Sequence, residues 1–197
     1  MALAHDNQKM SLETFFQWIE NHPGIRYEYL DGTITMMTGG TARHALIGSN
    51  LNRILGNLLE GSPCLVYSSD AFVQVTETAC VCPDLTISCD PRDRDDLEDE
   101  GELKIIQYPR VVAEVLSPGT EAKDRGIKAE HYQNCSTMQE FLLVDTQTPK
   151  IQLYRRTPGN LWTIQFFRLH EEIQLKSIGV KFPVVSVYTN TRLAKQK

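Results

Sequence analysis

The segment from Tyr108 to Pro118 constrains the fold of this chain more than any other stretch. It reads Tyr-Pro-Arg-Val-Val-Ala-Glu-Val-Leu-Ser-Pro, and its β-branched, apolar run ending at a Ser-Pro-Gly turn signal predicts a buried strand. One carboxylate, Glu114, interrupts the apolar run. Burying a carboxylate costs several kcal/mol unless it has a partner. We therefore expect a cation, a metal ion or a hydrogen-bond network opposite Glu114.

The overall composition is that of one folded domain. The chain has 197 residues, 41% of them hydrophobic and 23% charged. We assign residues 1–197 to a single domain, with 1–10 expected to be flexible and the core running from about 11 to 190. The net charge of −5 argues against a protein that coats nucleic acid, although it leaves room for a local basic site.

No apolar run in the sequence approaches the length of a membrane helix, and the first residues lack the apolar core of a signal peptide. We therefore expect a cytoplasmic protein without a membrane segment. The five cysteines are odd in number, and Cys80-Val81-Cys82 is not a zinc-binding spacing. Buried free thiols are the simplest interpretation. A thiol-based sensor that uses Cys80 and Cys82 is a weaker alternative.

Hydrophobic periodicity predicts an alternation of helices and strands. A Ser11 N-cap begins a helix that ends near Glu20, and Asp31-Gly32 joins two alternating runs as a tight hairpin. A second helix is expected at 41–60, with Thr41 as its N-cap, and a third at 120–134. The remaining expected elements are strands at 64–75, 81–88, 138–144, 150–155, 161–169 and 173–175, with a closing segment at 182–185. This order predicts an α/β (α+β) fold with one mixed central sheet flanked by helices, and an N-terminal helix and hairpin as an extension.

Several polar residues stand at positions where a strand or helix begins or ends. Asp84 follows Pro83, which cannot donate to a central ladder, so Asp84 is either directed into a cleft or a turn residue. His44 lies in the first turn of its helix, where a histidine is more often solvated than functional. Lys128 follows Asp124 by four residues, and an ion pair along one helix is its simplest role.

The segment from Asp90 to Glu102 is dense in charge, and we expect a solvated, mobile loop there. Its acidic residues 98–100 form no fixed coordination pattern, so a cation site in this loop is disfavoured.

Other familiar site motifs are missing from the sequence. Thr38-Gly39-Gly40-Thr41 lacks the lysine and spacing of a phosphate loop, and neither a G-x-S-x-G nor an H-E-x-x-H motif occurs.

Two acidic residues on neighbouring strands with a lysine beside them suit metal-dependent phosphodiester cleavage. The carboxylates hold Mg²⁺ through oxygen, the metal activates water and polarises the phosphate, and the lysine stabilises developing charge. Asp84 and Glu114 provide such a pair. With these residues the sequence resembles the PD-(D/E)XK nuclease superfamily, and more narrowly the Uma2 family of restriction-endonuclease-like proteins. The motifs that carry this resemblance are 27–32, His44, 83–85, 112–118, Thr120, 124–128, Tyr132 and 141–145.

The resemblance implies a Mg²⁺- or Mn²⁺-dependent endonuclease that acts on DNA. It implies Asp84 and Glu114 as metal ligands and Glu28 as an auxiliary ligand or a base acting through water. The superfamily usually has a lysine two positions after the second acid, where this chain has Leu116. The resemblance implies that Lys128 has taken over that role, with Lys123 as the weaker substitute.

The substrate-binding residues expected from the same resemblance are His44, Arg43 and Arg125, with Arg53 as a further candidate for the DNA backbone. A homodimer is also expected, since cutting two strands favours two sites, although the sequence identifies no interface.

A competing hypothesis is an inactive descendant of the fold that binds nucleic acid or protein. The acidic net charge and Leu116 support this alternative.

Overall fold

The computed structural model describes residues 10–22, 24–37, 39–95 and 105–195. Of the N-terminal residues 1–10, which were expected to be flexible, only Met10 is among the described residues. The acidic residues 98–100 also lie outside them. Within the described parts, thirteen strands form a five-stranded, a six-stranded and a two-stranded sheet. The mixed α+β fold class is therefore confirmed, but its strands are divided among several sheets rather than joined in one central sheet.

The five-stranded sheet has the order β2-β1-β5-β4-β7. Its strands are β1 (Tyr27–Leu30), β2 (Thr33–Met36), β4 (Phe72–Thr76), β5 (Ala79–Val81) and β7 (Ile105–Ile106). Asp31 and Gly32 adopt positive φ angles of 49° and 89°, as the tight turn between β1 and β2 requires. The predicted hairpin is thus confirmed. It is an integral part of this sheet, because β1 also pairs with β5.

The six-stranded sheet has the order β11-β10-β9-β8-β6-β3. Its strands are β3 (Leu65–Ser68), β6 (Leu85–Ser88), β8 (Pro109–Val115), β9 (Glu140–Val144), β10 (Lys150–Thr157) and β11 (Leu161–Arg168). Neighbours are antiparallel except β8 and β9, which are parallel. Strand β8 lies inside the sheet, and its predicted burial is confirmed from Val111 to Val115. The two-stranded sheet pairs β12 (Glu172–Leu175) with β13 (Val180–Pro183).

Two strands that the sequence pattern predicted as continuous are interrupted. The segment 64–75 divides into β3 and β4, and the segment 81–88 lies mostly in β6 after a break that follows β5. In each segment, the part before the interruption and the part after it belong to different sheets. Because Pro83 has no N–H group, the ladder ends at the break that contains Asp84. The chain crosses between the sheets at these two interruptions.

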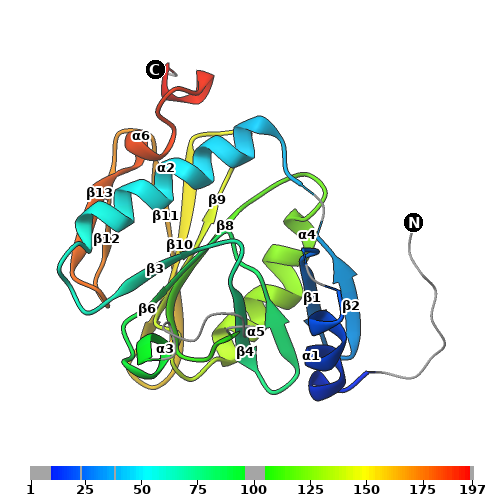
Figure 1. Ribbon diagram of the computed structural model, residues 1–197. Coiled ribbons are helices and arrows are strands. Elements are labelled where there is room, and N and C mark those ends of the chain that lie inside the picture. The colour runs from blue at the N-terminus through cyan, green and yellow to red at the C-terminus, as the bar shows by residue number, and fades with distance from the viewer. Residues whose placement is uncertain (1–9, 23, 38, 96–104, 196–197) are drawn as a thin grey trace.

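Helices α2 and α5 pack on opposite faces of the six-stranded sheet, and α1 packs against the five-stranded sheet. The described helices are α1 (Leu12–Glu20), α2 (Ala42–Leu58), α3 (Arg92–Asp95), α4 (Glu121–Lys123), α5 (Ala129–Asn134) and α6 (Val184–Val187), with a π-helical turn η2 (Asp124–Lys128) and a 3₁₀ turn η3 (Arg192–Lys195). Figure 1 shows α2 lying across one face, and buried Ile47, Leu51 and Leu55 pack it there. The predicted N-caps Ser11 and Thr41 are confirmed, since each side chain accepts a backbone hydrogen bond.

A second buried cluster joins the two large sheets. It contains Val73 and Val81 from the five-stranded sheet, Phe141 and Leu143 from the six-stranded sheet, and Tyr132 from α5. Leu116 also belongs to this cluster and is 2% exposed. The position where the nuclease superfamily has its lysine is therefore part of the apolar core, which a charged side chain would disrupt.

The cysteines only partly follow the sequence-based interpretation. Cys80, Cys82 and Cys135 are free and buried, as expected. Cys64 and Cys89 form a disulfide, so the expectation of free thiols is wrong for these two. They flank the antiparallel pair Leu65–Ser88 of β3 and β6, and this register brings two residues that are 25 positions apart in sequence into contact.

Candidate active site

A cleft of about 780 Å³ opens between the two large sheets and α2. Residues from β1, β2, α2 as far as Arg53, the β5–β6 break, β8 and the α4–η2 segment line it. Seven of the nine candidate residues named from the sequence line this cleft: Glu28, His44, Arg53, Asp84, Glu114, Lys123 and Lys128. Segments far apart in the sequence therefore meet at one concave surface, as sites for bound ligands commonly require.

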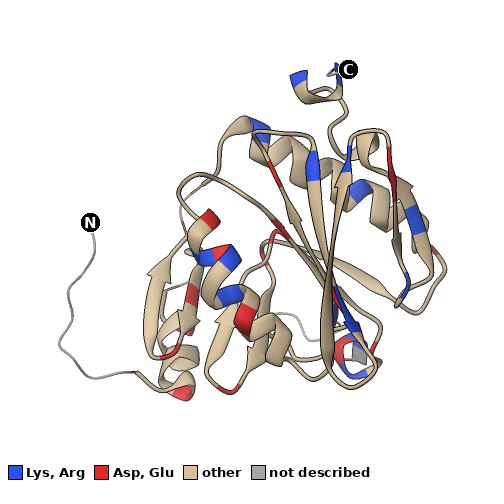
Figure 2. Ribbon diagram, turned by 180° about the vertical axis from the view of Figure 1, so that it is seen from behind, with Lys and Arg blue, Asp and Glu red and all other residues tan. Residues whose placement is uncertain are grey.

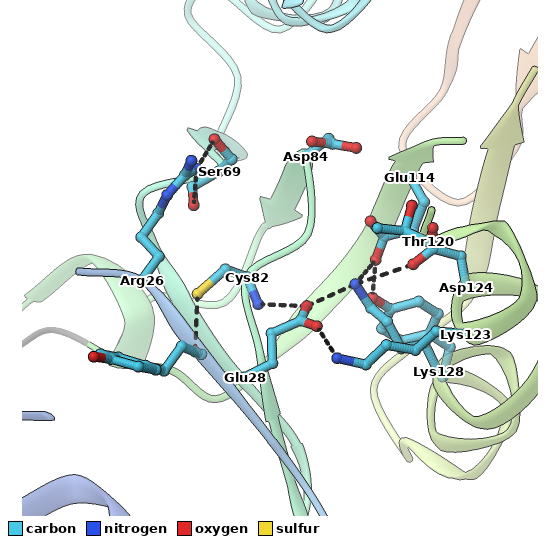
Figure 3. A network of polar contacts seen from close by, with 12 residues as sticks. Arg26, Glu28, Ser69, Cys82, Asp84, Glu114, Thr120, Lys123, Asp124 and Lys128 are labelled. Carbon is cyan, nitrogen blue, oxygen red and sulfur yellow. Dashed lines mark hydrogen bonds and ion pairs between the residues drawn. The ribbon is translucent and has the colours of Figure 1, made fainter. Parts of the chain in front are cut away.

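Lys128 lies at the centre of the polar network in this cleft. Its side chain is 2% exposed, and its Nζ lies 2.7 Å from Glu28 Oε1 and 2.6 Å from Glu114 Oε1. The predicted ion pair with Asp124 is also present, at 3.5 Å. Burial works to lower the pKa of Lys128, but the surrounding acidic groups outweigh burial and raise this pKa well above its usual range. The raised pKa keeps Lys128 charged at neutral pH, and Figure 3 shows its contacts with the surrounding acidic side chains.

Glu114 is the buried carboxylate predicted from the strand pattern, and its partners are now identified. The side chain is 5% exposed and contacts Lys128, while the Tyr132 hydroxyl donates a hydrogen bond to Oε1. Burial raises the pKa of Glu114 to about 8, in spite of the opposing attraction of Lys128. Glu114 is thus poised to lose or accept a proton near neutral pH.

Asp84 approaches Glu114 from the neighbouring strand, because β6 pairs with β8. Its Oδ2 accepts a hydrogen bond of 2.7 Å from the Val115 backbone N–H, which holds it at the end of β8. In Figure 3 the Asp84 carboxylate lies on the same side of the network as Glu114, and no contact is drawn between the two. Of the two interpretations left open by the sequence, a side chain directed into a cleft is confirmed.

Glu28 is fixed between two lysines. Its Oε1 contacts Lys128 Nζ at 2.7 Å and its Oε2 contacts Lys123 Nζ at 2.6 Å. The Cys82 backbone N–H also donates to Oε1, at 3.4 Å. Burial works to raise the pKa of Glu28, but Lys128 and Lys123 together outweigh it and lower the pKa. Since both carboxylate oxygens are already held by cations, Glu28 is placed to position the lysines rather than to face the solvent.

His44 lies on α2 opposite Asp84, with Nε2 3.3 Å from Asp84 Oδ2. The hydrogen bond with Asp84 raises the pKa of His44, although partial burial opposes this shift. The other two predicted substrate-binding residues do not line the cleft. Arg43 donates to the Thr146 carbonyl, and Arg125 binds Glu121 Oε1 and Gln152 Oε1. Both guanidinium groups serve contacts within the fold.

Four residues of the site were missed or underrated by sequence reasoning. Lys123 binds Glu28, and Tyr132 binds Glu114 from one turn beyond Lys128. Arg26 and Arg53 line the cleft, and Arg26 is held by the Ser69 hydroxyl at 2.7 Å. Spacing along the helix is a signal that identifies Tyr132, since it follows Lys128 by four residues. Figure 2 shows how charged residues of both signs gather on the segment from α4 to α5.

The carboxylates of the cleft determine whether a metal ion could bind there. In the ranges that the structure describes, no group of three or more His, Cys, Asp and Glu side chains is arranged to hold a metal ion. Proteins often hold Mg²⁺ through only one or two carboxylates, with water and substrate phosphate completing the shell. Asp84 and Glu114 provide two hard oxygen donors of this kind.

Comparisons with known proteins identify the family of this chain. The sequence model of the Uma2 family, described as "Putative restriction endonuclease", matches residues 12–184. The chain belongs to the Uma2 family. Two relatives are uncharacterized proteins of Synechocystis: slr1290 is 38% identical over 91% of this chain and 92% of its own length, and sll1609 is 24% identical over 70% and 76%.

A solved structure shares the Uma2 fold of this chain. It is the crystal structure of a "putative nuclease belonging to DUF820" from Anabaena variabilis, with a TM-score of 0.70 and 16% identity over 91% of this chain and 98% of the other. At this identity the likeness shows the fold alone. Among the described helices of the present chain, none is both long and apolar enough to cross a membrane.

Proposed function

We propose that this Uma2 protein is a Mg²⁺- or Mn²⁺-dependent endonuclease that hydrolyses DNA phosphodiester bonds. One observation carries the proposal. The buried, charged Lys128 is held between the carboxylates of Glu28 and Glu114, in an open cleft that Asp84 also lines. A buried ion pair seldom stabilises a fold more than apolar residues of similar volume would. We therefore attribute the buried lysine and its carboxylates to function rather than to packing. Lys128, Glu114 and Asp84 supply the groups that phosphodiester hydrolysis requires.

Each of these residues has a distinct role in the proposed reaction. Asp84 and Glu114 would hold the metal ion, which when bound polarises the phosphate and activates water. Lys128 orients the attacking water and stabilises the negative charge that develops on the phosphate oxygens. Glu28 fixes the direction of Lys128 through its 2.7 Å contact, and His44 fixes Asp84.

Two arginines of the cleft are the better candidates for contacts with the DNA backbone. Arg26 is anchored by the Ser69 hydroxyl and carbonyl, at 2.7 and 3.3 Å, and Arg53 is exposed on α2. Guanidinium groups position phosphates through paired N–H donors. We propose Arg26 and Arg53 in this role in preference to Arg43 and Arg125, because the first two line the cleft and the other two do not.

A cleavage assay tests the proposal. Purified protein is incubated with plasmid, with single-stranded DNA and with RNA, in Mg²⁺, Mn²⁺ or EDTA. We expect metal-dependent cleavage of DNA, and a loss of about 10²–10³ in rate for Lys128→Met, because a preorganised charge-stabilising group is removed. Asp84→Asn and Glu114→Gln should abolish cleavage, while Glu130→Gln, at an exposed position on α5, should not. Cleavage that persists in EDTA and in both carboxylate variants would refute the site.

An inactive binding module is the second candidate function. The observation that favours it is the net charge of −5 together with lysines already neutralised by carboxylates, which reduces attraction to DNA. Calorimetric titration with Mn²⁺ separates the two candidates. Binding that disappears in Asp84→Ala supports the enzyme, and absence of binding at about 10 mM metal, far above typical working concentrations, supports the module.

A further inference from the structure

Strand β11 forms an open edge of the six-stranded sheet. It pairs with β10 over eight residues, from Thr157–Leu161 to Lys150–Arg168, and no other described strand pairs with its outer side. The opposite edge strand of this sheet, β3, has only four residues. An edge strand of this length presents a row of unpaired backbone donors and acceptors, to which another strand can bind.

The side chains of β11 do not protect this edge. Proteins usually place lysine, proline or a bulge on an exposed edge strand. Residues 161–167 contain no charge and no proline, and the β10–β11 register is regular throughout. Three of the seven large apolar side chains that are exposed among the described residues lie here: Leu161 at 68%, Ile164 at 50% and Phe166 at 59%.

Ile164 continues a row of apolar side chains that leads across the sheet from the core. It pairs with Tyr154, and Tyr154 pairs with Phe141, so the three side chains share one face. Tyr154 and Phe141 stack with ring centroids 4.2 Å apart, and Phe141 is fully buried. The apolar row thus begins in the core between the sheets and stops at Ile164 in contact with solvent.

We propose that β11 is the surface on which a second copy of this chain docks, by antiparallel pairing of the two β11 strands about Ile164. Such a contact is self-complementary, as a two-fold interface requires. It places Ile164 against its own copy and Trp162 against Phe166 of the other copy, so the apolar row continues into the second core. The only charge on the strand, Arg168, would lie about 27 Å from its counterpart, whereas parallel pairing would bring the two together.

Sedimentation velocity tests the proposal over a range of concentrations. We expect a concentration-dependent dimer for the natural chain, and for Ile164→Lys a dissociation constant raised by at least about tenfold. Leu58→Lys, which changes a 45% exposed apolar side chain on α2, is the matched control and should not alter the dimer. A natural chain that stays monomeric at every concentration, or a dimer that Ile164→Lys leaves unchanged, overturns the proposal.

Cysteine cross-linking tests the register. Ile164→Cys should form an interchain disulfide on mild oxidation, because the two-fold axis places this residue against itself. Thr163→Cys, which lies on the opposite face of β11, should cross-link far less. The three natural free cysteines are buried and give little background. Equal cross-linking of both variants, or none in Ile164→Cys while the dimer persists, would refute pairing about Ile164.

Discussion

At the scale of single residues, the site is a set of charges that compensate one another. Lys128 contacts three carboxylates, and Glu28 contacts two lysines. Breaking such a buried pair leaves an uncompensated charge, which costs about 3–5 kcal/mol. Each of these side chains is therefore fixed by the others, and the polar atoms are held in place before any substrate arrives.

The pKa of His44 should depend on Asp84. The hydrogen bond between them raises the pKa of His44, so Asp84→Asn, which removes the charge, should lower it. The C2–H proton signal of His44 in an NMR titration measures this directly. As a control, Glu130→Gln, at an exposed position on α5, should leave the pKa of His44 unchanged. A His44 pKa that is unchanged in Asp84→Asn would contradict the contact.

Metal binding should strengthen as the pH rises. Below the pKa of Glu114, at about 8, its carboxyl group holds a proton that a metal ion must displace. The affinity for Mn²⁺ should therefore increase from about pH 6 to pH 8 and then level off, with protons released on binding. Titration calorimetry in buffers of different ionisation enthalpy counts these protons. An affinity independent of pH over this range would show that Glu114 is not a ligand.

At the scale of elements, irregularities position the functional groups. The predicted helix at 120–134 is interrupted at Gly126, which has ψ of −108°, and a π-helical turn carries Asp124 and Lys128. Such π turns recur at functional sites. The break at Pro83 similarly leaves Asp84 between the sheets. Regular elements in both places would direct these side chains differently.

The disulfide between β3 and β6 should stabilise the fold without serving the site. Cys89 follows the end of β6 opposite to Asp84, so its loss should not disturb the carboxylates. Replacing both cysteines by serine should lower the free energy of unfolding by about 3 kcal/mol, since the bond closes a loop of 25 residues. Urea unfolding measures the change. A reductant should destabilise the natural chain to the same extent and leave the double variant unchanged.

At the scale of the whole molecule, the two large sheets should unfold together. The shared cluster contains residues of both sheets, including Val81 and Phe141. The single domain expected from the sequence therefore predicts one unfolding transition. The chain has two tryptophans, and their fluorescence reports on different sheets. Trp18 packs beside the five-stranded sheet, and Trp162 lies on β11 of the six-stranded sheet.

Variants with one tryptophan each, Trp18→Phe and Trp162→Phe, test this cooperativity. Fluorescence of the remaining tryptophan should give the same urea midpoint as circular dichroism of that variant, because a single transition unfolds both sheets. Two separated midpoints within one variant would instead indicate two domains. Fluorescence of Trp162 should also respond to dimer formation, since it lies on β11.

The sequence by itself determined the local features of this protein. The N-caps Ser11 and Thr41, the Asp31-Gly32 turn and the buried strand around Glu114 all depend on residues close together in the chain, whose preferences act locally. The family could be identified from short motifs for the same reason. The prediction of a single continuous strand was wrong at 64–75 and at 81–88, because the two parts of each segment belong to different sheets.

Only the tertiary structure decided which partners meet. Lys128 and Glu28 are 100 positions apart, and no periodicity indicates that their side chains lie 2.7 Å from each other. The same holds for Lys123 and Glu28, for the Cys64–Cys89 disulfide, and for Arg43 and Arg125, whose donors are used inside the fold. Ion pairs form across a cleft only after apolar burial has brought the sheets together, so their choice of partner is a property of the packed molecule.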